Sequence, residues 1–327
     1  MTGGRAPTIA DIWAAAQRIA PFVRRTPVAS SAEIDALCGA QVLLKCEHLQ
    51  HTGAFKYRGA TNAVQSLTDA EAAHGVATHS SGNHGQALAM AAQVRGIPCH
   101  VVMPHNSARI KLDAVRAQGA TISLCESTMT ARETGLAQVL ADTGATAVHP
   151  FSDPRVIAGQ GTAARELLAD HPDIDLVMTP VGGGGLICGS AIAAHAHDAG
   201  IGIVGAEPEG ARDAYDSLRQ GERVTRHTPD TICDGLRGTI GAINFALMRE
   251  HDVEVLLVSD ADVIDAMRLV RNALNLVIEP SSATVIAALA RYPGSFQDRI
   301  VGVVLSGGNV DMTDHAASVS SPPDRVV

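Results

Sequence analysis

The sequence is poor in aromatic residues, in clustered positive charge and in long apolar runs, and each shortage excludes a class of protein. Aromatic residues make up only 3% of the 327 residues, so the core must depend on the aliphatic side chains that dominate a hydrophobic share of 46%. The formal net charge of −9 argues against a nucleic-acid partner, which requires clustered Lys and Arg to neutralise phosphates. No run of 18 apolar residues is present, so neither a membrane-spanning helix nor a membrane partner is expected.

The cysteines lack the spacing of a metal site or of a disulfide framework. The six cysteines lie far apart and form no Cys-x-x-Cys pair, so we expect reduced and mostly buried thiols. The first residues, MTGGRAPTIADIW, contain no apolar signal-peptide region. Together these features predict a cytoplasmic protein.

Strand-like and helix-like segments alternate along most of the chain. Several expected strands, such as DLVMTPV, are continuous apolar runs, which is typical of strands buried on both faces of a parallel sheet. The alternation and the length predict an open α/β architecture of about two domains. We expect residues 53–148 to form a small domain inserted in a large one made by residues 1–52 and 149–314. Residues 315–327 are polar and contain proline, so a disordered tail is expected there.

The strongest local signal is the glycine run Gly182-Gly183-Gly184-Gly185, followed by Leu186. It comes after a buried strand and opens an apolar helix, so backbone N–H groups can converge on an anion without obstruction by side chains. The run does not fit G-x-G-x-x-G, and no Gly-Lys-Ser/Thr follows it as in a P-loop. A single phosphate monoester fits better, although a flexible turn would also explain the glycines.

Three further segments carry side chains that could take part in chemistry. SSGNHGQ, at residues 80–86, offers hydroxyls, an amide and helix N-terminal N–H groups to a carboxylate, although Ser and Asn are also ordinary N-caps. Lys56 follows Phe55 in the linker-like segment GAFKYRG, and most lysines are simply solvated. Ser306 follows the last buried strand in LSGGN, where a plain glycine turn is the ordinary explanation.

Taken together, the four segments resemble, in their order along the chain and in their spacing, the fold-type II pyridoxal-phosphate enzymes, which are tryptophan synthase β-like. The resemblance is strongest to the threonine/serine dehydratases and serine racemases. The resemblance covers about residues 8–313 and implies two open, twisted, mostly parallel sheets flanked by helices, a homodimer, and pyridoxal 5'-phosphate as cofactor. It implies the following cofactor contacts: Lys56 forms the Schiff base, Phe55 lies against the pyridine ring, Asn83 bonds the 3-hydroxyl, Gly182, Gly183, Gly184, Gly185 and Leu186 hold the phosphate, and Ser306 meets the ring nitrogen. It also implies that Ser80, Ser81, Asn83 and His84 surround the substrate carboxylate.

The expected reaction follows from these residue types. A lysine amine becomes a competent nucleophile once burial lowers its pKa. The uncharged Ser306 cannot hold a protonated ring nitrogen, which favours prompt β-elimination. Lys56 would then remove the α-proton of serine, threonine or 3-hydroxyaspartate, giving a 2-oxo acid and ammonia. Two alternatives stay open: a racemase that uses Lys56 and Ser81 as two bases, and a non-catalytic binding paralogue.

The resemblance also implies a divalent-cation site and a specificity residue. Glu207, the carbonyl of Ala211, and Asp213 match the family's cation ligands, and such hard oxygen donors suit Mg²⁺, although solvated acids at a helix cap would look the same. Arg132 matches an arginine of the small domain that can face the active site. There it would bind a second, distal carboxylate and point to 3-hydroxyaspartate, whereas the ordinary alternative is a surface helix arginine.

Overall fold

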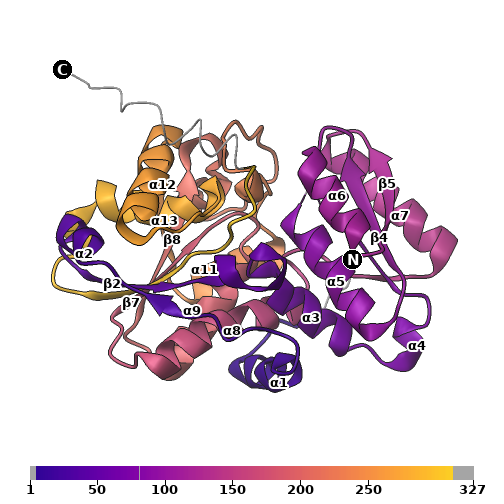
Figure 1. Ribbon diagram of the computed structural model, residues 1–327, viewed down its shortest axis with the longest axis horizontal. Coiled ribbons are helices and arrows are strands. Elements are labelled where there is room, and N and C mark those ends of the chain that lie inside the picture. The colour runs from indigo at the N-terminus through magenta and orange to yellow at the C-terminus, as the bar shows by residue number, and fades with distance from the viewer. Residues whose placement is uncertain (1–4, 81, 312–327) are drawn as a thin grey trace.

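Two lobes, each built on its own sheet, lie side by side in the computed structural model, which describes residues 5–80 and 82–311 (Figure 1). One lobe holds a six-stranded sheet and the other a four-stranded sheet. Helices flank both sheets, and every strand pair is parallel except β1 with β2. The architecture expected from the sequence is confirmed.

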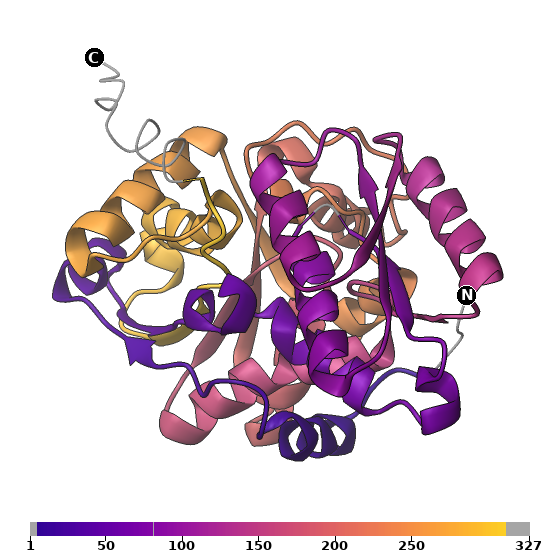
Figure 2. The same cartoon turned by 45° about the vertical axis from the view of Figure 1, so that its right-hand side comes forward.

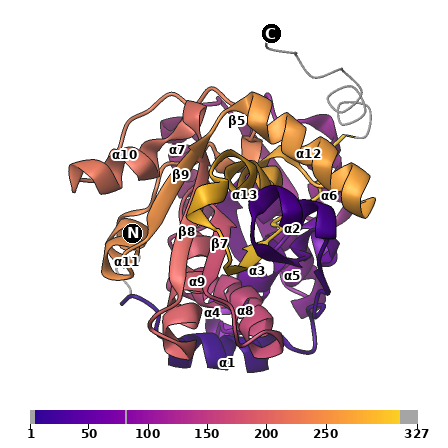
Figure 3. The same ribbon diagram turned by 90° about the vertical axis from the view of Figure 1, so that its left-hand side faces the viewer.

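The six-stranded sheet is buried between two layers of helices. Its central strand β10 pairs in parallel with β2 on one side and with β7 on the other, so Gly302 lies between Leu43 and Val177. Helices α1, α8 and α9 cover one face, and α2, α12 and α13 cover the other (Figure 3). The strands, in sheet order, are β1 Val28–Ala29, β2 Gln41–Lys45, β10 Ile300–Val304, β7 Leu176–Pro180, β8 Gly202–Pro208 and β9 Glu254–Val258.

The four-stranded sheet has its own apolar core. Its strands are, in sheet order, β5 Thr121–Cys125, β4 Cys99–Pro104, β3 Val76–His79 and β6 Thr146–Ala147. Buried aliphatic residues of α3 and α5 pack against β3 and β4, whereas α7 has no fully buried residue. Figure 2 shows this lobe turned toward the viewer.

The helices alternate with the strands along the chain, as expected. They are α1 Ile9–Ile19, α2 Ala32–Cys38, α3 Lys56–Gln65, α4 Asp69–Ala72, α5 Asn83–Arg95, α6 Arg109–Ala117, α7 Met129–Thr143, α8 Pro154–Asp170, α9 Gly185–His197, α10 Asp213–Gln220, α11 Ala242–Glu250, α12 Asp260–Leu274 and α13 Pro280–Arg291. Short 3₁₀ turns lie at Glu47–Leu49, His51–Gly53, Glu209–Ala211, Asp234–Leu236 and Pro293–Ser295. Within the described ranges, no helix is both long enough and apolar enough to cross a membrane. The expected tail, residues 315–327, lies outside the described residues.

The second half of the segment GAFKYRG, from Lys56 on, is the first turn of a helix. Helix α3 begins at Lys56, and the fully buried Arg58 donates hydrogen bonds to Glu47 and to Glu166. Lys45, also fully buried, donates to Glu166 at 2.7 Å. The two cations and two carboxylates balance, and this pairing makes burial of the charges tolerable. The network therefore fixes the start of α3, where Lys56 lies, against both β2 and α8.

Candidate active site

A cavity of about 650 Å³ lies where the two lobes meet, at the carboxyl ends of β3, β7 and β10. Ligands of open parallel sheets bind at this edge. Every described residue that was predicted for the cofactor or the substrate lines it, whereas Ser81 lies outside the described residues. These lining residues are Phe55, Lys56, Ser80, Asn83, His84, Arg132, Gly182, Gly183, Gly184, Gly185, Leu186 and Ser306.

Lys56 is the first residue of α3, and its side chain lines the cavity. Its Nζ donates to the carbonyl oxygen of Pro150 at 3.0 Å and lies 5.1 Å from the centre of the Phe55 ring. Burial lowers the pKa of Lys56 to about 8, and the Glu279 carboxyl opposes part of this shift. At pH 7 roughly a tenth of the amine is then neutral, far more than for a solvated lysine. A neutral lysine amine of this kind is a competent nucleophile toward a carbonyl carbon.

The glycine run forms a cradle at the start of α9. Gly184 has a φ of +90°, a left-handed conformation that favours glycine, and it caps the helix. A Cβ atom at Gly183 would lie 2.2 Å from Cγ of Phe151. Among the described residues, no acceptor partners the backbone N–H groups of Gly183, Gly184, Gly185 and Leu186. These free donors and the helix N-terminus are suited to a phosphate group.

Asn83 is fixed by two residues that sequence reasoning did not assign. Its Nδ2 donates to both carboxyl oxygens of Glu279, at 2.9 and 3.1 Å, and its Oδ1 accepts from Asn309 Nδ2 at 3.0 Å. Burial raises the pKa of Glu279 to about 7, with a further contribution from Asp234. Glu279 precedes Pro280, a pairing that marks a helix start but gives no hint that its side chain faces a cavity.

Ser306 and Phe55 are brought together by the backbone. The Phe55 N–H donates to the carbonyl oxygen of Ser306 at 3.0 Å, and Ala54 forms an isolated antiparallel bridge with Gly307. Ser306 is buried and lines the cavity at the end of β10. The segment before Lys56 and the loop after the last strand therefore form one wall.

The cavity is also lined by an arginine that has no counter-ion among the described residues. Arg132 on α7 is half-buried and faces the cavity, and burial lowers its pKa. Its Nε has no hydrogen-bond partner, and no carboxylate of the described ranges pairs with the guanidinium. Nearby His79 also lines the cavity, and burial together with the Arg132 charge lowers its pKa to about 4, so it is neutral at pH 7. A cavity-facing guanidinium that lacks a protein partner is suited to a carboxylate of the substrate.

Ser80 and His84 flank the start of α5. The Ser80 hydroxyl accepts the Gly82 N–H at 3.2 Å, and the buried His84 places Nε2 3.4 Å from the carbonyl oxygen of Val148. Burial moves the pKa of His84 well below its usual range, so the ring is neutral. Its Nδ1 has no partner among the described residues. Both side chains can therefore still take part in binding a ligand.

The residues expected to hold a cation lie together but outside this cavity. Glu207 accepts the N–H groups of Ala214 and Tyr215, and Asp213 Oδ2 accepts that of Ile240. Burial raises the pKa of both carboxyls, and Asp213 raises that of Glu207 further. Asp213 Oδ1 is buried without a hydrogen bond, and the described chain holds no cluster of three His, Cys, Asp or Glu side chains suited to a metal. Two buried carboxyls that repel each other beside the Ala211 backbone are oxygen donors of the kind that bind a divalent cation.

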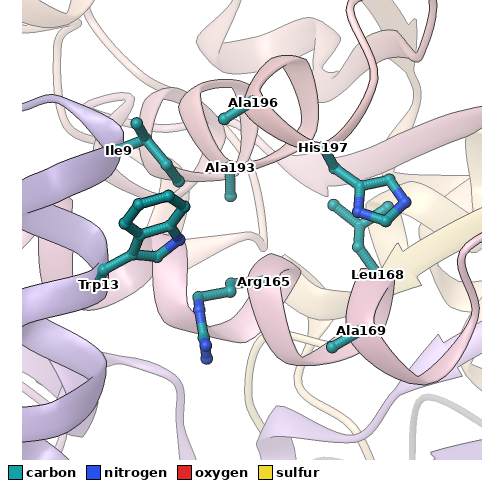
Figure 4. Close-up of a pocket in the computed structure, with 8 residues that line it drawn as sticks. All are labelled: Ile9, Trp13, Arg165, Leu168, Ala169, Ala193, Ala196 and His197. Carbon is teal, nitrogen blue, oxygen red and sulfur yellow. The ribbon is translucent and has the colours of Figure 1, made fainter.

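A second pocket, of about 190 Å³, lies between α1, α8 and α9 on the large lobe (Figure 4). The rings of Trp13 and His197 and the side chain of Arg165 surround it, and its other lining residues are aliphatic. None of the predicted site residues reaches it. The larger cavity is therefore the candidate active site.

Comparison with known proteins agrees with this geometry. A family model described as "Pyridoxal-phosphate dependent enzyme" matches residues 19–307. The β-hydroxyaspartate dehydratase of Paracoccus denitrificans is 46% identical over 94% of this chain and 97% of its own length. The serine racemase of Dictyostelium discoideum is 44% identical, over 94% and 96% of the two chains. The L-threo-3-hydroxyaspartate ammonia-lyase of Saccharomyces cerevisiae is 39% identical, over 97% and 98%.

Solved structures show the same fold along the whole match. Maize serine racemase superposes with a TM-score of 0.93 at 40% identity, covering 96% of this chain and 97% of its own. The processed form of threonine deaminase isoform 2 from Solanum lycopersicum gives a TM-score of 0.89 at 32% identity, over 94% and 85%. With its lysine, glycine cradle and serine gathered in one cavity, the chain belongs to the pyridoxal-phosphate dependent enzyme family.

Proposed function

We propose that this protein is an ammonia-lyase that converts 3-hydroxyaspartate to a 2-oxo acid and ammonia by β-elimination. The observation that carries the choice of substrate is Arg132, a half-buried guanidinium that faces the cavity and has no carboxylate partner in the described part of the chain. The side chains of serine and threonine carry no charge that could neutralise this guanidinium. The distal carboxylate of 3-hydroxyaspartate could neutralise it. Relatives named for hydroxyaspartate, at 46% and 39% identity, support the same substrate class.

The cofactor residues would share the work of holding pyridoxal 5'-phosphate. Lys56 would carry the aldehyde carbon, and Phe55 would lie against the ring. The Gly182–Gly185 cradle and Leu186 would take the phosphate, and Asn83 and Ser306 would contact the 3-hydroxyl and the ring nitrogen. The bound cofactor supplies an electron sink for the substrate's α-carbon.

The remaining residues would orient the amino acid and move one proton. Ser80, Asn83 and His84, with Ser81, would bind the α-carboxylate at the start of α5, where N–H groups favour an anion. Lys56, with its lowered pKa, would take the α-proton through Nζ. We also propose that residues 53–148 act as a small substrate-binding domain against a large domain of residues 1–52 and 149–314, because they contribute Asn83 and Arg132.

Substrate turnover by an Arg132→Ala variant tests the proposal. Oxo-acid release would be followed for the 3-hydroxyaspartate isomers, L- and D-serine and L-threonine. Loss of a charged hydrogen-bond pair costs about 1.5–3 kcal/mol, so kcat/KM for 3-hydroxyaspartate should fall by roughly 10- to 150-fold while that for serine changes little. The exposed Arg109 of the same lobe, changed to alanine, is the control. Equal losses for serine and 3-hydroxyaspartate would remove the distal-carboxylate assignment.

A serine racemase is the second candidate function. The observation in its favour is the 44% identity to a serine racemase, together with a serine at position 81 that could return a proton opposite Lys56. Racemisation in deuterium oxide would give inverted serine carrying deuterium at the α-carbon, in excess of pyruvate. A Ser81→Ala variant should then lose racemisation and keep elimination. Pyruvate as the sole product would exclude this candidate.

We further propose that Glu207, the Ala211 carbonyl and Asp213 hold Mg²⁺ or another divalent cation in a structural role. Two buried carboxyls with raised pKa values support the site, and Asp213 Oδ1 forms no hydrogen bond, although it lies 3.4 Å from His227 Nε2. We also propose that the protein is a homodimer and that it is cytoplasmic. The six cysteines are unpaired in the structure, and burial raises the pKa of five buried thiols, which suits a reduced state. Light scattering would test the dimer.

A further inference from the structure

Glu279 is a buried carboxyl for which the proposed reaction has no use. Its backbone N–H donates to the Gly307 carbonyl at 3.0 Å, where α13 begins beside the loop that carries Ser306. The residue is 3% exposed and lines the candidate active-site cavity. A Cβ atom at Gly307 would lie 2.5 Å from Glu279 Oε1, so the loop passes directly over the carboxylate.

Charged and titratable groups surround this carboxyl from several elements. Lys56 acts on it from α3 and Lys111 from α6, and both favour its ionised form. Asp234, which itself pairs with Lys111, disfavours ionisation, and the Cys233 thiol lies near. No lysine or arginine within the described ranges forms an ion pair with Glu279. Among the described residues, both hydrogen bonds that its side chain accepts come from the Asn83 amide.

The Asn83 amide is held from both ends by one chain of hydrogen bonds. Asn309 Nδ2 donates to the Thr52 carbonyl at 2.7 Å and to Asn83 Oδ1 at 3.0 Å, and Asn83 Nδ2 donates to Glu279. These hydrogen bonds link the loop before Lys56, the loop after β10 and the starts of α5 and α13. An ionised carboxylate can only accept hydrogen bonds, so in that form Glu279 determines which end of the amide is the nitrogen.

We propose that Glu279 is a positioning residue that orients the Asn83 amide and sets its second N–H toward the 3-hydroxyl of the cofactor. The inference rests on the proposed function, because it uses the assignment of Asn83 to that hydroxyl. One N–H of the amide satisfies the contact with both Glu279 oxygens, and the other stays available to the cavity. Without Glu279, only the hydrogen bond from Asn309 would hold the amide, which could then rotate and present its oxygen to an oxygen of the cofactor, which would repel it.

The first experiment measures the cofactor dissociation constant by titrating each apoenzyme with pyridoxal 5'-phosphate. Glu279→Ala and Asn83→Ala should each weaken binding about ten- to hundredfold, as expected for a lost charged hydrogen bond. The double variant should bind no more weakly than the weaker single variant, because both changes break one interaction. Glu279→Gln, which keeps an acceptor oxygen, should stay within about threefold of the unmodified enzyme. Glu254→Ala, which removes an exposed carboxylate on β9, should change nothing.

The second experiment follows the absorbance of the bound cofactor against pH. The unmodified enzyme should show a step near neutral pH, where Glu279 ionises beside Lys56, and Glu279→Gln should remove the step. A carboxyl that merely caps α13 would leave the profile unchanged. This readout decides the question even if Glu279→Ala does not fold, because the glutamine variant is isosteric.

Three results would overturn the inference. If Glu279→Ala bound the cofactor normally while Asn83→Ala bound it weakly, the role of Glu279 would be refuted and the assignment of Asn83 would stand. Losses that simply add in the double variant would show two independent interactions. Normal binding by Asn83→Ala would refute the assignment of Asn83 itself, and with it this part of the proposed function.

Discussion

Replacement of Gly183 by alanine tests whether the glycine run serves as a cradle for the cofactor. The new Cβ would lie 2.2 Å from Cγ and 2.4 Å from both Cδ atoms of Phe151, whereas carbon atoms normally approach to about 3.5–4.0 Å. Phe151 is held in place, since its carbonyl accepts from Asn244 at 2.9 Å and its ring lies 4.5 Å from the His149 ring. The glycine loop that contains residue 183 must therefore shift. Overpacking of this kind costs about 1–3 kcal/mol, which corresponds to a roughly 5- to 150-fold weaker affinity for the cofactor.

Equilibrium titration of the apoenzyme with pyridoxal 5'-phosphate measures this loss. Gly294→Ala is the matched control, because a Cβ there meets no atom within 4 Å. The double variant Gly183→Ala/Phe151→Ala should bind the cofactor as Phe151→Ala does, since removal of the ring makes room for the added methyl group. The reasoning is refuted if Gly183→Ala binds normally or if the double variant stays weaker than Phe151→Ala.

Two other features give further predictions. Arg58→Met leaves Glu47 and Glu166 buried without the cation that they share, so the free energy of unfolding measured in urea should fall by about 3–5 kcal/mol. The control is Arg116→Met, which changes an exposed arginine and should lower the free energy of unfolding only slightly. Equal losses for the two variants would contradict the network. Burial raises the pKa of Glu207, so the folded protein keeps a proton that the unfolded chain releases, and this group's contribution to stability falls as pH rises above the usual carboxyl range. Mg²⁺ should therefore raise the Tm more at pH 8 than at pH 5, and an equal shift at both would speak against the cation site.

The strands and the glycine cradle could be predicted because their signals are local. The apolar runs at Leu176–Pro180 and Ile300–Val304 form central strands of the large sheet, where burial on both faces leaves no polar alternation. The glycine run follows the first of these strands directly. In a parallel sheet, that order alone places it at the edge where ligands bind.

Features that depend on distant partners could not be predicted. GAFKYRG looked linker-like because nothing nearby shows that Arg58 pairs with Glu166, which lies 108 residues away. Glu279 was missed for the same reason, since its partner Asn83 precedes it by 196 residues. The helix Ala32–Cys38 was also not anticipated, because at 7 residues it is too short to show a clear period.

The most direct test of the account is to identify the lysine that carries the cofactor. The chain has three lysines, of which Lys45 is fully buried against Glu166 and Lys111 lines the same cavity as Lys56 but pairs with Asp234. Borohydride reduction of the cofactor-loaded enzyme, followed by peptide mapping, should label Lys56 alone, and Lys56→Ala should take up no label. A label on Lys111, or none on the unmodified enzyme, would contradict the central claim.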